Sequence, residues 1–172
     1  MAVCAVLLAL SGCASMSEDQ CRRADWQQQG TRDGRDGYGR DRVGDHAEAC
    51  AKVGVVPDEP RWLTGWSDGV RQYCRPARGW ELGLRGEYYR GVCADQPGGD
   101  EFERYYEAAK RVYTLGQQLD RNYSEMQRLE RSLADAKTDE ERKQLRAQLR
   151  ELDIEQQRLR ARQRVELTNA PR

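Results

Sequence analysis

The C-terminal part of the chain alternates apolar and polar positions in a pattern typical of long amphipathic helices. From Phe102 to Leu133 the apolar side chains recur at alternating steps of three and four residues, interrupted by the polar Glu130. This spacing forms the a/d seam of a coiled coil. It predicts a first helix about 54 Å long, at a rise of about 1.5 Å per residue. The expected seam positions are Phe102, Tyr105, Ala109, Val112, Gly116, Leu119, Tyr123, Met126 and Leu133.

A second long helix is expected after Thr138, because Thr138-Asp139-Glu140-Glu141 matches a capping box. In that motif the threonine hydroxyl accepts a hydrogen bond from a free backbone N–H, and the glutamate reaches back toward the helix start. The pattern favours an antiparallel hairpin, with the second helix about 42 Å long. One continuous rod through Lys137, or self-association of two chains through the coiled coil, would also cover the seam. The second seam is Leu145, Leu149, Leu152, Gln156 and Leu159.

Glycines four residues apart recur in the N-terminal part of the chain. Such pairs lie on one helix face and let another backbone approach closely. Each glycine costs about 1 kcal/mol of helix propensity, so we expect a packing role. The pairs are Gly30 with Gly34, Gly65 with Gly69, and Gly79 with Gly83. Helices are predicted near 18–34, 42–54 and 59–74, with a fourth helical segment near 79–90; Pro57 and Pro76 mark breaks between them.

A short apolar run at the start of the chain ends in Leu10-Ser11-Gly12-Cys13. The run is too short for a bilayer core, which needs about 20 helical residues, and it ends in small residues as a cleaved signal does. We expect a bacterial lipoprotein signal peptide over residues 1–12, cleavage between Gly12 and Cys13, and a lipidated tether over residues 13–20. No Lys or Arg precedes Cys13. The alternative is the apolar start of a buried helix.

Lipidation of Cys13 would fix the compartment of the protein. Two or more acyl chains hold a protein stably on a membrane. Ala14 stands where an aspartate commonly signals retention in the inner membrane. We therefore expect a cell-envelope protein attached to the outer membrane and facing the periplasm.

Four cysteines remain for disulfides once Cys4 leaves with the signal and Cys13 carries lipid. They are Cys21, Cys50, Cys74 and Cys93. An even number in an oxidising compartment predicts two disulfides. Three pairings are open, and the favoured one joins Cys21 to Cys50 and Cys74 to Cys93. The close ligand pairs of a zinc site and the C-x-x-C motif of redox catalysis do not occur among them.

Charge and composition set the class of protein. The 29 basic and 29 acidic residues cancel, so no global field favours nucleic acid. Charged residues make up 34% of the chain, which indicates a small core and much solvated helix. The expected fold class is all-α: a small disulfide-stapled helical head over residues 21–96, a linker over 97–100 and an antiparallel coiled-coil hairpin over 101–168.

The only histidine of the chain, His46, is the main candidate for chemistry. With Asp45 and Glu48 nearby, it could act as a base or a ligand. A surface or cap role is favoured, because no second histidine and no nucleophile in an evident elbow accompany it. The aspartates near it do not have the spacing of a calcium loop. We expect no enzymatic activity, no cofactor and no metal.

Aromatic residues of the head region allow two interpretations. They either form the core of a domain that has few other large apolar residues, or make a surface that stacks on sugar or peptide. The candidates for such a ligand surface are Trp26, Trp62, Trp66, Trp80, Tyr88 and Tyr89.

An ordered set of residues follows Leu10-Ser11-Gly12-Cys13, the lipobox of the expected signal peptide, and includes the glycine pairs. It contains Cys21, Asp25-Trp26, Gly30, Asp33-Gly34, His46, Cys50, Gly54-Val55, Pro57-Asp58, Trp62, Gly65, Gly69, Tyr73-Cys74, Gly79, Gly83, Gly86, Tyr88 and Cys93. Over residues 10 to about 95 this order resembles a bacterial lipoprotein family known as domain of unknown function 2799. The resemblance implies a lipid-attached, cysteine-containing envelope protein and supplies no catalytic residues. The segment before Leu10 is shorter than the family pattern.

Two functions from different classes fit these observations. The favoured one is a lipid-anchored envelope protein with a structural or interaction role, whose partner is a protein or the cell wall. The alternative is a binding module for the cell wall or a small ligand, using the Trp- and Tyr-rich head.

Overall fold

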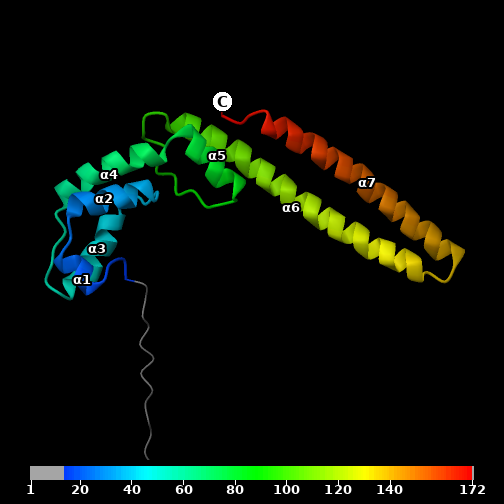
Figure 1. The fold of residues 1–172 in the computed structure, drawn as a ribbon, viewed down its shortest axis with the longest axis horizontal. Coiled ribbons are helices and arrows are strands. Elements are labelled where there is room, and N and C mark those ends of the chain that lie inside the picture. Colours follow the sequence, from blue (N-terminus) through cyan, green and yellow to red (C-terminus); the bar gives the residue numbers. More distant parts are fainter. Residues whose placement is uncertain (1–13, 172) are drawn as a thin grey trace, which may run out of the picture. The chain divides into compact units, whose positions relative to one another are not determined.

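The computed structural model describes residues 14–171, and this part of the chain is all-helical, as predicted. The predicted signal peptide, its cleavage site and Cys13 lie outside the described residues. Contacts divide the chain into a first unit, Met1–Tyr73, and a second unit, Cys74–Arg172. The helices are α1 (Glu18–Arg22), α2 (Trp26–Arg35), α3 (Arg42–Ala51), α4 (Glu59–Tyr73), α5 (Pro76–Leu84), α6 (Gly99–Asp135) and α7 (Asp139–Leu167) (Figure 1).

Two of the expected helices have wrong limits. The single helix expected near 18–34 is two helices, because Asp25 caps α2: its Oδ1 accepts hydrogen bonds from the backbone N–H groups of Gln27 and Gln28. The segment expected near 79–90 begins earlier, since Pro76 suits the first turn of α5. It also ends earlier, with Gly86 in the left-handed conformation at φ +67°. Residues 18–20 of the expected tether are already part of α1.

The glycine pairs of the first unit bring α2 and α4 into backbone contact (Figure 1). A Cβ atom on Gly34 would lie 2.5 Å from the carbonyl oxygen of Trp66 and 2.7 Å from the backbone nitrogen of Val70. A Cβ atom on Gly65 would meet the backbone of Gln27 in the same way. The glycines of each helix therefore face the backbone of the other, which confirms the predicted packing role.

The second unit pairs α5 with the first turns of α6 by the same device. A Cβ atom on Gly79 would lie 2.5 Å from the carbonyl oxygen of Phe102, and one on Gly83 would lie 2.9 Å from the backbone nitrogen of Lys110. The disulfide Cys74–Cys93 closes this unit, as Cys21–Cys50 closes the first. The predicted pairing of the cysteines is confirmed.

The pairing of α2 with α4 in the first unit recurs in the pairing of α5 with the start of α6 in the second. The series Gly30, Gly34, Gly37 in the first returns as Gly79, Gly83, Gly86 in the second. In each, the last glycine has positive φ and lies against a tyrosine ring, Tyr73 for Gly37 and Tyr113 for Gly86. The turn that follows is closed alike, from Tyr38 N–H to Asp33 O (2.9 Å) and from Glu87 N–H to Leu82 O (3.1 Å).

The facing helices match as well. Trp66 Nε1 of α4 donates to the carbonyl oxygen of Tyr38 at 2.8 Å. Tyr106 Oη of α6 donates to that of Glu87, the corresponding residue, at 2.9 Å. By the same correspondence Leu82 stands in the place of Asp33, and Phe102 in the place of Trp62.

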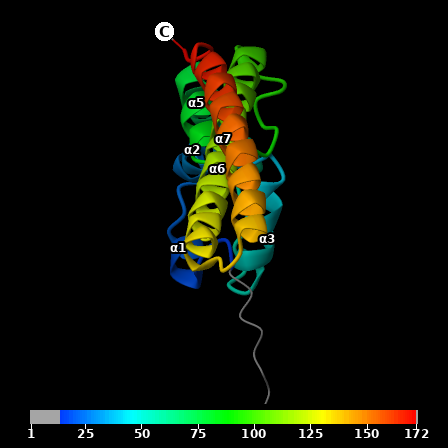
Figure 2. The same ribbon diagram turned by 90° about the vertical axis from the view of Figure 1, so that its right-hand side faces the viewer.

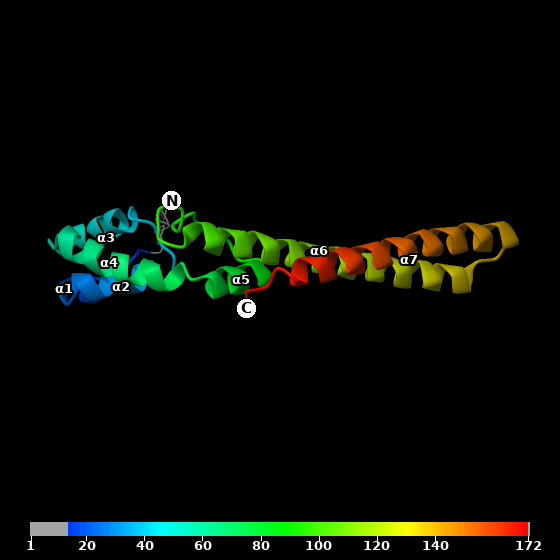
Figure 3. The ribbon, with the colours of Figure 1, turned by 90° about the horizontal axis from the view of Figure 1, so that it is seen from above.

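Helices α6 and α7 form the predicted antiparallel hairpin, and Figures 2 and 3 show them side by side. The continuous rod is excluded, because the chain turns between Asp135 and Asp139. Thr138 caps α7, with its hydroxyl accepting from Glu141 N–H at 3.2 Å. The Glu141 carboxylate reaches back to Lys137 N–H at 3.0 Å, one residue further than a standard capping box.

The seam of α6 is shifted from the expected one. Leu115, Asn122 and Leu129 are buried, where Gly116, Tyr123 and the polar Glu130 slot were expected. Tyr123 is 56% exposed. With these residues the steps of three and four continue without interruption from Val112 to Ala136, so Asn122 is a polar residue of the seam rather than Glu130. The expected seam of α7 is confirmed where it is most enclosed, at Gln156 and Leu159.

The linker expected at residues 97–100 is partly helical, since α6 begins at Gly99. The division between the units falls earlier, after Tyr73. The reason is that α5 packs with α6, and the second disulfide joins two cysteines of the second unit.

Candidate functional site

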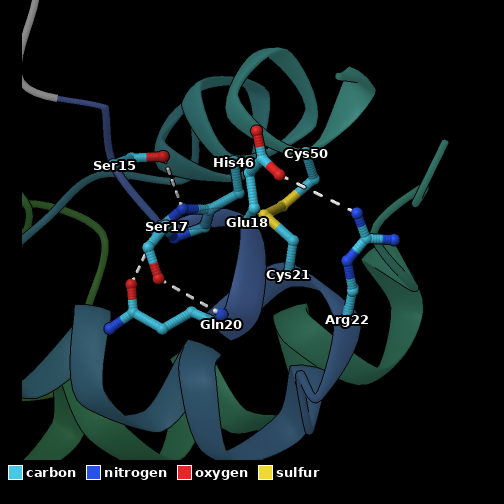
Figure 4. The surroundings of a disulfide bond; sticks show 8 residues. All are labelled: Ser15, Ser17, Glu18, Gln20, Cys21, Arg22, His46 and Cys50. Atoms are coloured by element: carbon cyan, nitrogen blue, oxygen red, sulfur yellow. Dashed lines mark hydrogen bonds and ion pairs between the residues drawn. A yellow bond between two sulfur atoms is a disulfide. The ribbon is translucent and has the colours of Figure 1, made fainter. Parts of the chain in front are cut away.

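A buried polar cluster in the first unit is centred on His46. His46 and Cys50 lie one turn apart on α3, and the disulfide from Cys50 to Cys21 fastens α3 to α1. Figure 4 shows the imidazole beside this disulfide, with Ser15 directed toward it. His46 is 1% exposed. The expectation of a surface or cap histidine is therefore wrong.

The imidazole bridges a hydroxyl and a carboxylate. His46 Nε2 lies 2.9 Å from Asp33 Oδ2, and His46 Nδ1 lies 2.8 Å from Ser15 Oγ. An ionised carboxylate only accepts hydrogen bonds, so the hydrogen of the neutral ring belongs on Nε2. Nδ1 then carries the lone pair and accepts from the Ser15 hydroxyl. The chain Asp33–His46–Ser15 thus has the connectivity carboxylate, imidazole, hydroxyl.

Asp33 is held in place by two further donors. Trp62 Nε1 donates to Asp33 Oδ2 at 2.9 Å, and Gln29 Nε2 donates to Asp33 Oδ1 at 3.1 Å. Arg32 in turn donates to Gln29 Oε1 at 2.6 Å. The carboxylate is 4% exposed, so its charge is compensated by hydrogen bonds rather than by water.

Beside the cluster the first unit has a polar hollow of about 900 Å³. Ser15 and Asp33 belong to its wall, so the hydroxyl end of the chain of hydrogen bonds is open to it. Charged side chains of both signs complete the wall: Asp19, Arg23, Asp25, Arg32, Asp36 and Arg42. Arg42 pairs with Asp45 at 2.9 Å and lies over the Tyr38 ring at 4.3 Å, and its Nε is buried without a hydrogen-bond partner among the described residues.

Sequence reasoning singled out His46 but missed Ser15 and gave Asp33 no chemical role. The three lie on separate segments: before α1, on α2 and on α3. They meet because the disulfide and the glycine face of α2 bring these segments together. One feature of the sequence indicated a role for Asp33: this charged residue lies between Gly30 and Gly34, on a helix whose glycine face is expected to pack against another backbone.

The aromatic candidates differ widely in exposure. Trp26, Trp62 and Trp66 are 8%, 0% and 3% exposed, and their rings fill the core beside the glycine faces. Tyr89 is occupied in the second unit, where its hydroxyl contacts Glu103 Oε1 at 2.9 Å and accepts from Cys93 N–H at 2.8 Å. Trp80 is partly buried, and Tyr88 alone of the six is largely exposed, at 79%. The interpretation as a core accounts for the three buried tryptophans.

No group of three or more His, Cys, Asp or Glu side chains in residues 14–171 is arranged to hold a metal ion. In the same part of the chain, no helix combines the length and apolar character that crossing a bilayer requires.

The sequence model of a family described as "Protein of unknown function (DUF2799)" matches residues 25–111. The chain belongs to this family. The matched segment contains the three helices that carry the glycine pairs, α2, α4 and α5, and ends within α6. Asp33 and His46 lie inside it, and Ser15 precedes it. No curated protein and no solved structure matches the chain.

Proposed function

We propose that this protein is a lipid-anchored component of the cell envelope, facing the periplasm from the outer membrane, with a structural or protein-interaction role. The lipobox ending in Cys13 motivates the anchor. The disulfides Cys21–Cys50 and Cys74–Cys93 fit an oxidising compartment, because such bonds are rare in the reducing cytosol.

The α6–α7 hairpin carries the interaction role in this proposal. α5 packs against the start of α6, and the remaining length of α6 packs against α7. The hairpin thus projects a long pair of helices whose outer faces are free of other described elements of its own unit. Tyr123 and Ile154 are exposed by 56% and 49%, and both lie next to the level at which Asn122 Nδ2 donates to Leu152 O (3.1 Å). A partner protein would gain apolar contact there.

The interaction role can be tested by crosslinking in cells. A photoreactive amino acid placed at Lys137, in the turn of the hairpin, or at Tyr123 should yield a discrete protein adduct identifiable by mass spectrometry. The same group at Lys52, an exposed residue after α3, is the matched control and should not yield that adduct. Recovery of only lipids and self-adducts from all three positions would sink the proposed interaction.

The anchor is tested separately by the mass of the mature chain. We expect an N-terminus at Cys13 bearing acyl chains. A Cys13→Ser variant lacks the sulfur that carries the lipid, so it should be released from the membrane fraction, because stable attachment needs acyl chains. An uncut and unmodified N-terminus in the wild-type protein would rule out lipidation.

A further inference from the structure

We propose that Ser15 is a nucleophilic serine, activated by His46 and Asp33, that accepts the acyl group of a small polar ester entering the neighbouring hollow. This goes beyond the structural role proposed above and does not depend on it. An activated nucleophile needs a base within hydrogen-bond reach and a third group that orients the base. Ser15 Oγ, His46 and Asp33 provide both contacts, at 2.8 and 2.9 Å.

The direction of the hydrogen bonds suits proton transfer from the serine. When the ring is neutral and its hydrogen lies on Nε2, facing Asp33, Nδ1 is the nitrogen that takes the Ser15 proton. The imidazolium formed in this step would be stabilised by the negative charge of Asp33. Trp62 Nε1 and Gln29 Nε2 hold the carboxylate so that it cannot turn away from the ring.

The recurrence of this helix pairing in the second unit shows that it does not need the polar chain of hydrogen bonds. In the second unit the same pairing is built with Leu82 in place of Asp33 and Phe102 in place of Trp62, and both residues are buried. Apolar replacements of buried polar pairs are often neutral or stabilising. The buried carboxylate of Asp33 is therefore not required by the helix pairing itself.

The position of Ser15 gives the nucleophile access to a substrate. Ser15 is partly exposed and lines the hollow of about 900 Å³, whereas His46 is buried and does not line it. The charged wall favours a polar acyl donor over an apolar one. Arg42 lines the same hollow and places a positive charge in its wall.

The reaction follows from these roles. Ser15 Oγ bonds to the carbonyl carbon of the ester while its proton moves to His46 Nδ1. The bond from that carbon to the leaving oxygen then breaks, and the leaving oxygen takes the proton and departs as an alcohol. Water hydrolyses the acyl-serine by the same transfer and restores the Ser15 hydroxyl.

A fluorophosphonate probe tests the nucleophile directly. Ser15 Oγ displaces fluoride from the probe, which leaves a stable phosphonylated serine that peptide mass spectrometry can locate. With the full chain purified in detergent, we expect labelling at Ser15 about a hundredfold faster than at Ser17. Ser17 is the matched control, because it lies two residues away and its hydroxyl accepts from Gln20 N–H instead of contacting a base.

Variants separate activation from simple exposure. Ser15→Ala should abolish labelling and hydrolysis of p-nitrophenyl acetate, and Ser17→Ala should leave both unchanged. Asp33→Asn keeps an oxygen to accept from Trp62 and His46 but removes the charge, so the labelling rate should fall at least tenfold while the far-UV circular dichroism stays as in the wild type. Equal labelling of Ser15 and Ser17, or no labelling of Ser15 in the folded wild-type protein, would overturn the proposal.

Discussion

At the scale of single residues, the closest approaches between helices occur at glycines, because a glycine has no side chain to keep the other backbone away. Gly30 of α2 faces the backbone of α4, where an added Cβ atom would overlap the carbonyl group of Trp62 and lie 2.8 Å from the nitrogen of Trp66. Backbone atoms within a helix cannot give way as the end of a flexible side chain can. The glycine is therefore required by its partner helix and not by its own conformation.

Gly30→Ala should destabilise the first unit by about 1–3 kcal/mol or more, because of this overlap. Gly44→Ala is the matched control, since nothing lies within 4 Å of its added Cβ atom, and alanine is the better helix former by up to about 1 kcal/mol. Chemical denaturation followed by tryptophan fluorescence measures both. Equal stability of the two variants would contradict the close packing of α2 on α4.

At the scale of elements, the α6–α7 hairpin combines an apolar seam with buried amides. Asn122 and Gln156 are 8% and 7% exposed, and Asn122 Nδ2 donates to Leu152 O at 3.1 Å. Buried without a hydrogen-bond partner among the described residues are Asn122 Oδ1 and Gln156 Oε1. A polar residue at one seam position specifies the register of a coiled coil at a cost in stability. The amides thus favour one alignment of α7 on α6.

Asn122→Leu should raise the melting temperature of the second unit and increase its self-association, because an apolar seam is more stable and less selective. Gln127→Leu, on the exposed side of α6, is the control and should not raise the melting temperature. Thermal denaturation and analytical ultracentrifugation provide the two measurements. A lower melting temperature for Asn122→Leu would show that the hydrogen bond to Leu152 stabilises the hairpin by more than the burial of the Asn122 amide costs.

The hairpin also carries one pH-sensitive contact near its open end. Arg111 Nε donates to Glu166 Oε1 at 2.9 Å, and this hydrogen bond lowers the pKa of Glu166 below its usual value. Because the folded pKa is the lower one, the stabilisation is complete above the pKa of the unfolded chain, about 4.3. It is lost as the pH falls through the folded pKa.

Glu166→Gln should therefore reduce stability at neutral pH by up to about 1 kcal/mol, as expected for a partly exposed pair, and should make little difference well below pH 4. Glu151→Gln changes an exposed glutamate of the same helix and serves as the control. Denaturation curves recorded across the acidic range give the comparison. A constant difference between wild type and Glu166→Gln at all pH values would argue against the ion pair.

At the scale of the whole molecule, each unit is closed by its own disulfide. Cys21–Cys50 spans 29 residues and Cys74–Cys93 spans 19. A cross-link over loops of this length stabilises by about 3–4 kcal/mol in the chain-entropy description. In the first unit the bond also fixes α3, and with it the position of His46.

Replacing Cys21 and Cys50 together by serine should lower protection in the described residues of the first unit and leave those of the second close to wild type. Replacing Cys74 and Cys93 should do the reverse. Hydrogen exchange with peptide resolution reports each unit separately. Loss of protection in both units from either pair of replacements would show that they unfold as one.

The sequence by itself determined the class of fold, the hairpin with its cap at Thr138, the packing role of the glycine pairs and the presence of two disulfides, whereas the structure selected one of their three pairings. These features follow from the local spacing of apolar residues and from residue types that have few structural uses. Gly30 allows close helix packing, Thr138 caps a helix, and Cys21 forms a disulfide. Helix limits that depend on a single cap, as at Asp25, were harder to place.

Only the tertiary structure decided which face of α6 is buried, and that Asp33, His46 and Ser15 meet. The seam was placed one residue off at Asn122. A pattern of apolar positions assigns asparagine to the solvent side, and the hydrogen-bond acceptor that allows this amide to be buried, Leu152 O, is 30 residues away in the sequence. The hydrogen bonds that join Asp33, His46 and Ser15 were not predicted for the same reason, because His46 lies 13 residues from Asp33 and 31 from Ser15 in the sequence. Contacts between distant segments follow from how helices pack, and no local pattern encodes them.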